Sequence, residues 1–371
     1  MASTATGGNT AKFDVCIDAL MNGCVNAFTQ LYTLSHRPPL CVDELAQTMF
    51  SVPDETLPWV LERLTAAEMK RRHSDYRGVL YEHTELAAYF EKHGDKEQAI
   101  SQLSQALQAC VDSLDHELEG EAHEAIALLF ERLGVLVEAT THHETRLKLA
   151  EISSKPEVRQ RAAKNLIRVF NARGNALLAE QKHLEAKAFF EKAVACAKNC
   201  GDTAAEAKAY ASLGSVTVLI GDLNKALEYN QRFLLVSREA KDGHGEAAAA
   251  LEVAKLQGSL GHSADAINSL KDALAIAEAA NDLDGINSAC RQLADTYKAD
   301  GNNVSAVHYF REHFKVSRDI GDARAIENAR ISLGFAMGDH HFTHAGNRRG
   351  FLNLVVEDLP ALLEWMGTGA M

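Results

Sequence analysis

The sequence predicts an all-α protein, a right-handed superhelical solenoid of helix-turn-helix repeats with N- and C-terminal capping helices. The first observation is a set of six alanines separated by 40 residues, with one interval of 47. The second is a column of glycines five residues before these alanines, flanked on both sides by apolar residues at helical spacing. Because one hairpin cannot bury its apolar face alone, neighbouring hairpins must stack. The alanines are Ala99, Ala139, Ala186, Ala226, Ala266 and Ala306.

Each glycine of this column is expected to end the first helix of a hairpin, because glycine readily takes the left-handed conformation that a helix end requires. An aspartate that follows, such as Asp95 or Asp222, is expected to cap the second helix. One repeat has Gln181 in place of the glycine. The glycines are Gly94, Gly134, Gly221, Gly261 and Gly301.

A second column of small residues falls inside the first helix of the later repeats. Small side chains at these positions, like the alanines, are expected to let the backbones of paired helices approach closely. The column contains Gly174, Gly214, Ala254, Ala294 and Gly334.

Four segments are predicted along the chain. Residues 1–11 are expected to be a disordered tail, and residues 12–77 an N-terminal helical cap with helices near 13–34, 42–50 and 57–70. Residues 78–337 form the repeat array, with about six repeats and one extra helix, and an altered turn or linker is expected near 152–161. Residues 338–371 are expected to form a loop and a capping helix at 351–366 that covers the last repeat.

The repeat resembles the tetratricopeptide repeat. One block carries Leu213-Gly214, Gly221, Ala226 and Tyr229, and another carries Leu293-Ala294, Tyr297, Gly301, Ala306 and Tyr309. The usual unit has about 34 residues, whereas this unit has 40, which suggests longer helices.

The two ends of the chain are similar to the axonemal tetratricopeptide repeat family of motile cilia and flagella. The similarity lies in Cys16–Gly23, Ala27–Tyr32 and Leu362–Trp365. It implies a scaffold attached to dynein-arm subunits, linkers or doublet-microtubule-associated proteins, located in the cytoplasm and cytoskeleton within an axoneme and needed for flagellar beating.

Composition favours protein partners. The 371 residues carry a net charge of −13 with a pI near 5.7, which argues against nucleic acid or an anionic membrane as the principal partner. No long apolar run or signal peptide is evident, and the seven scattered cysteines are typical of a reducing, intracellular compartment. No cofactor is predicted.

No catalytic or metal site is predicted. The sequence has no Walker loop, GxSxG, HExxH or GxGxxG motif. The group His340, His341 and His344 lacks the further ligands that zinc requires, and Cys196 with Cys200 is expected to be a half-buried pair of thiols. His142-His143 occupies the position of Tyr229-Asn230 in a later repeat, so packing and solvent contact are expected there.

A binding groove is predicted on the first helices of the repeats. The repeat register points a set of basic and amide side chains into it, which favours an acidic segment of a partner, although ordinary solvated helix positions remain a competing interpretation. These residues are Arg168, Asn171, Asn175, Lys208, Lys255, Arg291 and Lys298.

The leading functional hypothesis is therefore a non-enzymatic axonemal scaffold. The alternative is a soluble peptide-binding adaptor of the kinesin-light-chain or spindle-orientation type. The two differ in a testable way, because a scaffold stays with axonemes after detergent and salt extraction, whereas an adaptor has a soluble pool.

Overall fold

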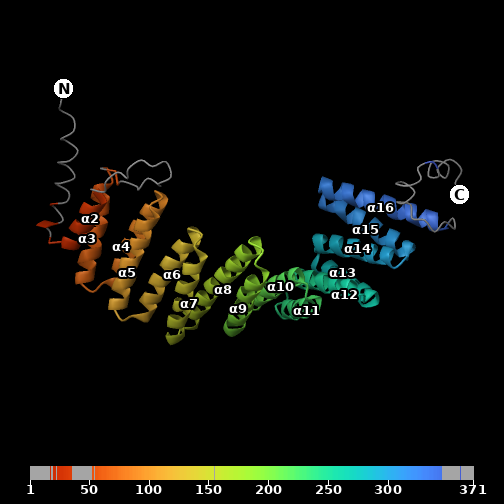
Figure 1. Ribbon diagram of the computed structural model, residues 1–371, viewed down its shortest axis with the longest axis horizontal. Coiled ribbons are helices and arrows are strands. Elements are labelled where there is room, and N and C mark those ends of the chain that lie inside the picture. Colours follow the sequence, from red (N-terminus) through yellow and green to blue (C-terminus); the bar gives the residue numbers. More distant parts are fainter. Residues whose placement is uncertain are drawn as a thin grey trace, which may run out of the picture. The chain divides into compact units, whose positions relative to one another are not determined.

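The computed structural model describes residues 17, 20–21, 23–35, 52–53, 55–153, 155–344 and 360. Within these residues the regular elements are α-helices, numbered as in Figure 1. The prediction of an all-α protein built from helix-turn-helix repeats is confirmed. Outside the described residues lie the predicted tail at 1–11, the start of the first cap helix, the helix near 42–50, and nearly all of the capping helix at 351–366.

Two helices, α2 (Val25–Ser35) and α3 (Leu57–Arg72), precede six helical hairpins and a last single helix, α16 (Ala323–His344). The hairpins are α4 (Tyr76–Lys92) with α5 (Lys96–Asp112), α6 (His116–Arg132) with α7 (Leu136–Ile152), α8 (Pro156–Ala179) with α9 (His183–Cys200), α10 (Thr203–Ile220) with α11 (Leu223–Glu239), α12 (Gly243–Ser259) with α13 (Ser263–Ala280), and α14 (Leu283–Ala299) with α15 (Asn303–Ile320).

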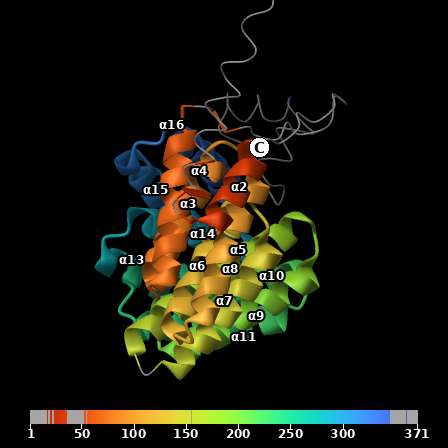
Figure 2. The same ribbon diagram turned by 90° about the vertical axis from the view of Figure 1, so that its left-hand side faces the viewer.

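The chain forms two compact units, Met1–Arg173 and Gly174–Met371, whose boundary falls inside α8. In the first unit, α4, α5, α6 and α7 pack side by side in chain order (Figure 1), and Figure 2 views this unit from the side of α2 and α3. In the second unit, α9 through α16 pack in the same sequential manner. Each unit is therefore a stack of hairpins, as the repeat predicts.

Left-handed backbone geometry recurs at the turn inside each hairpin. Gly221 has φ 92°, and the other column glycines also have positive φ. Gln181, the exception in the sequence, keeps the same conformation with φ 62°. The caps are as predicted, since the Asp95 carboxylate accepts the Gln98 N–H at 3.1 Å and Asp222 accepts the Lys225 N–H at 3.2 Å.

The alanine column lies in the first turn of the second helices, where the six alanines are at most 2% exposed. The small-residue column of the first helices faces the partner helix. A Cβ added at Gly174 would come within 2.6 Å of the Phe190 ring, and one added at Gly214 would collide with Asn230. The alanine column, Gly174 and Gly214 therefore mark positions where helices pack too closely for larger side chains.

The 47-residue interval lengthens a helix rather than a loop. The chain leaves α7 at Ile152 and enters α8 at Pro156, a residue suited to the first position of a helix. With 24 residues, α8 is longer than α10, which has 18. Residue 152 and residues 156–161 are helical, so most of the segment predicted as turn or linker belongs to α7 and α8.

The last helix also extends beyond its predicted end. α16 continues seven residues past Met337 to His344, into the segment expected to be a loop. The helix was predicted to end before Gly338. A glycine inside a helix costs only about 1 kcal/mol relative to alanine, however, and does not by itself end the helix.

Candidate functional site

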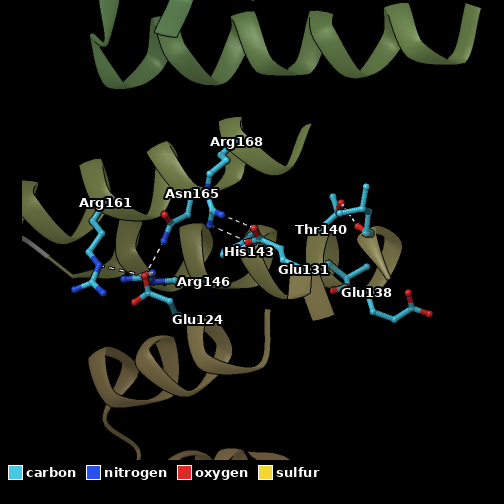
Figure 3. A network of polar contacts seen from close by, with 11 residues as sticks. Glu124, Glu131, Glu138, Thr140, His143, Arg146, Arg161, Asn165 and Arg168 are labelled. Carbon is cyan, nitrogen blue, oxygen red and sulfur yellow. Dashed lines mark hydrogen bonds and ion pairs between the residues drawn. The ribbon is translucent and has the colours of Figure 1, made fainter. Parts of the chain in front are cut away.

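The predicted groove residues of the first unit lie on α8, and one of them is occupied internally. The Arg168 guanidinium binds both carboxylate oxygens of Glu131 on α6, with Nη1–Oε2 at 2.5 Å and Nη2–Oε1 at 3.0 Å (Figure 3). Asn171 is half-buried, and its Oδ1 is buried without a hydrogen-bond partner. Arg168 therefore stabilises the packing of α6 against α8, and a partner would have to compete with Glu131 for its guanidinium.

The remaining predicted residues lie in the second unit and are exposed, as the groove prediction requires. However, acidic neighbours offset several of the cations. Lys255 Nζ lies 2.5 Å from Glu252, and Lys298 Nζ lies 3.1 Å from Asp339 on α16. Arg291 is more loosely placed, 3.9 Å from Asp295. The first helices thus present alternating charge, with exposed Asn175 and Lys208 completing the predicted set.

A network of charged side chains joins α6, α7 and α8 in the first unit (Figure 3). Its two acceptors, Glu124 and Glu131, lie seven residues apart on one face of α6. Arg146 on α7 forms a buried ion pair with Glu124, the two side chains being 4% and 8% exposed. From α8, Arg161 Nε approaches Glu124 at 3.1 Å and Asn165 donates to it at 2.6 Å. The network therefore ties three consecutive helices to one another.

Histidine 143 completes this network on the Glu131 side. Its side chain is fully buried, and its Nε2 lies 2.6 Å from Glu131 Oε1. Burial lowers the pKa of His143 despite the hydrogen bond to Glu131, so the ring is neutral near pH 7 and donates its Nε2–H. The prediction of packing at this position is confirmed, whereas solvent contact is wrong for His143, because its side chain is fully buried.

The pKa of Arg146 is also lowered, because burial outweighs the nearby Glu124 carboxylate. Burying such a pair costs desolvation energy that an exposed pair does not incur. In return, the network fixes the axial position of α8 against α6. Glu124 and Glu131 can both meet their donors on α8 only when that helix lies at one position along its axis. The repeat comparison missed this network, although the seven-residue spacing of Glu124 and Glu131 and that of Arg161 and Arg168 was visible in the sequence.

A smaller ionic cluster joins α3 to α4. Glu82 on α4 is 5% exposed and accepts from Arg63 at 2.9 Å and from Lys70 at 2.7 Å. Burial alone would raise the pKa of Glu82, but the hydrogen bonds from Lys70 and Arg63 outweigh it and the pKa is lowered. The first unit therefore joins its helices through buried carboxylates at two places.

Metal-binding geometry is not found among the described side chains, where no group of three or more His, Cys, Asp or Glu could hold an ion. The side chains of His341 and His344 lie outside the described set. Cys196 and Cys200 are half-buried thiols on α9, as predicted. Across the part of the chain that the structure describes, no helix combines the length and apolar character needed to cross a membrane.

Comparison with known proteins identifies the repeat and the family. The tetratricopeptide repeat model matches residues 167–200, which cover most of α8 and all of α9. Tetratricopeptide repeat protein 29 of Trypanosoma brucei brucei is 36% identical over the whole of this chain and 79% of its own length. The chain belongs to the tetratricopeptide repeat protein 29 family. The human member is 24% identical, over 88% of this chain and 72% of that protein.

Two solved structures that contain tetratricopeptide repeats are also similar to this chain. A signal-transduction ATPase with a tetratricopeptide repeat sensor from Pyrococcus horikoshii matches 84% of this chain and 45% of its own, with 16% identity and a TM-score of 0.47. YrrB, a tetratricopeptide repeat protein, matches 61% of this chain and 97% of its own, with 18% identity and a TM-score of 0.38. Family and repeat type together identify the chain as a tetratricopeptide repeat scaffold for protein interactions.

Proposed function

We propose that this chain is a non-enzymatic scaffold of the ciliary or flagellar axoneme, attached to dynein-arm or neighbouring doublet-microtubule complexes and needed for flagellar motility. The observation that carries the proposal is the whole-chain similarity to tetratricopeptide repeat protein 29, together with the resemblance of the chain's ends to axonemal repeat proteins. Its partners are other proteins, in keeping with a net charge of −13, which disfavours nucleic acid and anionic membranes.

The ion pairs and hydrogen bonds that join α6, α7 and α8 in the first unit support a role as a rigid scaffold. Reversible capture of a peptide needs a surface whose cations are available, but Arg168 is held by Glu131 and the α6–α8 network holds three helices in one register. A scaffold benefits from such bracing, because its docking faces keep their spacing when force is applied. The structure thus fits a rigid component better than an adaptable clamp in this unit.

Extraction of axonemes tests the proposal directly. The tagged full-length chain, expressed in ciliated cells, is expected to remain with axonemes after detergent and high-salt washes, and cells without it are expected to beat abnormally. A chain found wholly in the cytosolic fraction, and equally abundant in cells without cilia, would contradict the axonemal assignment.

The alternative, a soluble peptide adaptor of the kinesin-light-chain or spindle-orientation type, is supported by exposed cations on the first helices of the second unit. These are Lys208, Lys255 and Arg291. Reversing all three charges to glutamate is expected to weaken partner recovery if this face captures an acidic segment. Arg168 is left out of the variant, because its loss would leave Glu131 partly unpaired.

The matched control reverses three exposed cations that lie away from the first helices. Arg232 on α11, Lys241 in the following turn and Arg311 on α15 serve for this purpose, because the change in net charge is the same. Equal partner recovery from both triple variants would remove the groove hypothesis and leave the scaffold proposal intact.

We propose that residues after α16 cover its exposed face. Among the described residues, nothing lies within 4 Å of a Cβ added at Gly334, whereas the equivalent Gly214 is packed against Asn230. The amphipathic sequence at 351–366 is the proposed cover. Deletion of residues 345–371 is expected to speed hydrogen exchange in α16 and leave α4–α5 unchanged; unchanged exchange in α16 would exclude this role.

A further inference from the structure

A cleft of about 350 Å³ lies in the first unit, and its lining includes none of the residues predicted for the first-helix groove. Its walls come from α2, from α3 and from the second helix of the first hairpin, α5, and the first helix α4 contributes Val79 and His83. Three small buried residues, Ala27, Ala67 and Ala109, open the space at its base. The volume is at the lower end of the range of about 300–1,000 Å³ that ligand sites occupy.

Side-chain amides dominate the polar part of this wall. They are Asn26 and Gln30 from α2 and Gln105 and Gln108 from α5. Each carboxamide offers both a donor and an acceptor, the same pair of groups that a peptide bond presents. Such a lining suits a polypeptide backbone, whose N–H and C=O groups alternate along its length.

The charged groups of the cleft are already neutralised within the chain. Arg71 Nη2 donates to Asp112 at 2.6 Å, and Gln108 donates to the other oxygen of Asp112 at 3.0 Å. Glu68 accepts from the Ala27 N–H at 2.9 Å and from Arg72 at 2.6 Å. Because each charge has its partner, the cleft has no net attraction for a phosphate, a nucleotide or an acidic segment.

Among the described side chains that line the cleft, one buried polar atom lacks a hydrogen-bond partner. Gln30 Nε2 donates to Gln105 Oε1 at 2.7 Å across the cleft, while Gln30 Oε1 is buried with no hydrogen bond. A buried acceptor without a donor is destabilising, because it has lost its hydrogen bonds to water without replacement. A ligand that replaced the Gln30–Gln105 contact could supply a donor to Gln30 and occupy the amide of Gln105 as well.

We propose that this cleft binds an extended, largely uncharged segment of a partner protein, whose backbone amides pair with Gln30 and Gln105 and whose small side chains lie over the alanines. This site is separate from the first-helix groove and does not depend on it. It would give the first unit of the scaffold a docking site that recognises the N–H and C=O groups of a peptide backbone rather than charged side chains.

The probe is a phage-displayed library of short linear peptides, selected on the full-length chain. Thr29→Trp fills the cleft from its rim, and Thr33→Trp is the matched control, one turn further along α2. Both threonines are exposed and donate to the carbonyl four residues earlier, but Thr33 does not line the cleft. Circular dichroism of each variant verifies that the helices are retained.

Peptides of low net charge are expected to be enriched on the native chain and on Thr33→Trp but not on Thr29→Trp. Gln105→Ala should weaken their binding about tenfold, the loss of one well-placed hydrogen bond, whereas Gln231→Ala on α11 should not. N-methylation of a central peptide amide should reduce binding similarly, which recognition through side chains alone would not do.

Several results would overturn the proposal. They are the absence of any peptide that distinguishes Thr29→Trp from Thr33→Trp, selected peptides that depend on acidic side chains, or equal binding by Gln105→Ala. A dimer that Thr29→Trp dissociates would assign the cleft to a second copy, and binding of a peptide copied from residues 36–51 would assign it to the chain itself.

Discussion

The two units contain the same type of helical hairpin but bury different kinds of polar side chain. Among the described residues, the first unit buries charged side chains, including Glu82, Glu124 and Arg146. The buried polar residues of the second unit are Thr217, Asn230, Ser237, His313 and Ser317, none of which carries a permanent charge. Charge matching specifies the axial register of neighbouring helices at a desolvation cost, whereas small-residue packing specifies how closely they approach.

The second unit owes its close packing to small side chains. Ala247, Ala249, Ala250 and Ala254 are all buried in α12, and Gly214 in α10 lies directly against Asn230. The first unit should therefore be sensitive to loss of one charged partner, and the second to an added methyl group.

The largest effect is expected from breaking the buried pair of the first unit. Arg146→Met leaves the Glu124 carboxylate buried with fewer partners, so the free energy of unfolding should fall by about 3–5 kcal/mol. Hydrogen-exchange mass spectrometry of α6, α7 and α8 in a urea series measures it. Arg238→Met in the second unit is the control, because its pair with Glu246 is exposed on the arginine side and should cost about 1 kcal/mol or less. Equal losses would contradict the contrast between the units.

The next effect tests the second unit. Gly214→Ala forces Asn230 to move and should destabilise α10 and α11 by about 1–3 kcal/mol. Gly258→Ala on α12 is the control, because an added Cβ there would make ordinary contact with Ala266 at 3.9 Å. Since alanine favours a helix over glycine, that change should be neutral or stabilising by up to about 1 kcal/mol. Thermal unfolding of both variants decides whether packing distance is limiting.

The buried histidines should make the first unit weaker in mild acid. Burial, followed by repulsion from His123 and His143, lowers the pKa of His142 to about 4, and burial lowers that of His143. An unfolded histidine titrates near 6.5, so below about pH 6.5 the unfolded state binds more protons than the folded one. The free energy of unfolding should therefore fall by about 1–2 kcal/mol as the pH drops from about 7 to 5.

Replacement of His143 by asparagine, the residue at the equivalent position of a later repeat, tests whether His143 contributes to this acid sensitivity. His143→Asn, which copies Asn230, should reduce the pH dependence measured from urea midpoints at neutral and mildly acidic pH. His308→Asn on α15 is the control, because His308 is exposed. A slope unchanged by His143→Asn, or reduced equally by His308→Asn, would assign the acid sensitivity to other groups.

The smallest effect concerns the turns between hairpins. Lys241 has φ 56°, a conformation that glycine takes without steric cost, while Gly201 and Gly321 occupy the equivalent turns of neighbouring repeats. Lys241→Gly should stabilise the second unit by about 0.5–1 kcal/mol, measured by thermal unfolding. Destabilisation would show that the lysine side chain contributes more than its backbone conformation costs.

Much of the fold could be predicted because the repeat is a local signal. Glycine at the turn, aspartate at the cap and alanine in the first turn of the second helix act over a few residues, so their spacing located the hairpins directly. Helix ends were less predictable, as the continuation of α16 through Gly338 and the long α8 show. Gly338 alone does not end α16, and Pro156 lies at the first position of α8, where the missing N–H of a proline breaks no helical hydrogen bond.

The predicted groove shows that residue spacing predicts exposure but not which charged side chains are paired. The sequence predicted that Lys208, Lys255 and Arg291 would be exposed, and they are. It did not reveal that Arg168 binds Glu131, because the two residues are 37 positions apart and on different helices. Whether a cation is available to a partner depends on such distant neighbours.

The sequence by itself determined the type of fold, the order of the hairpins and the positions of their turns, because short-range backbone and packing preferences repeat every 40 residues. Only the tertiary structure decided which charges are buried and paired, which amides line the cleft beside α2, and how the extra residues of the 47-residue block are used. These features depend on contacts between helices that the chain brings together only when the hairpins stack.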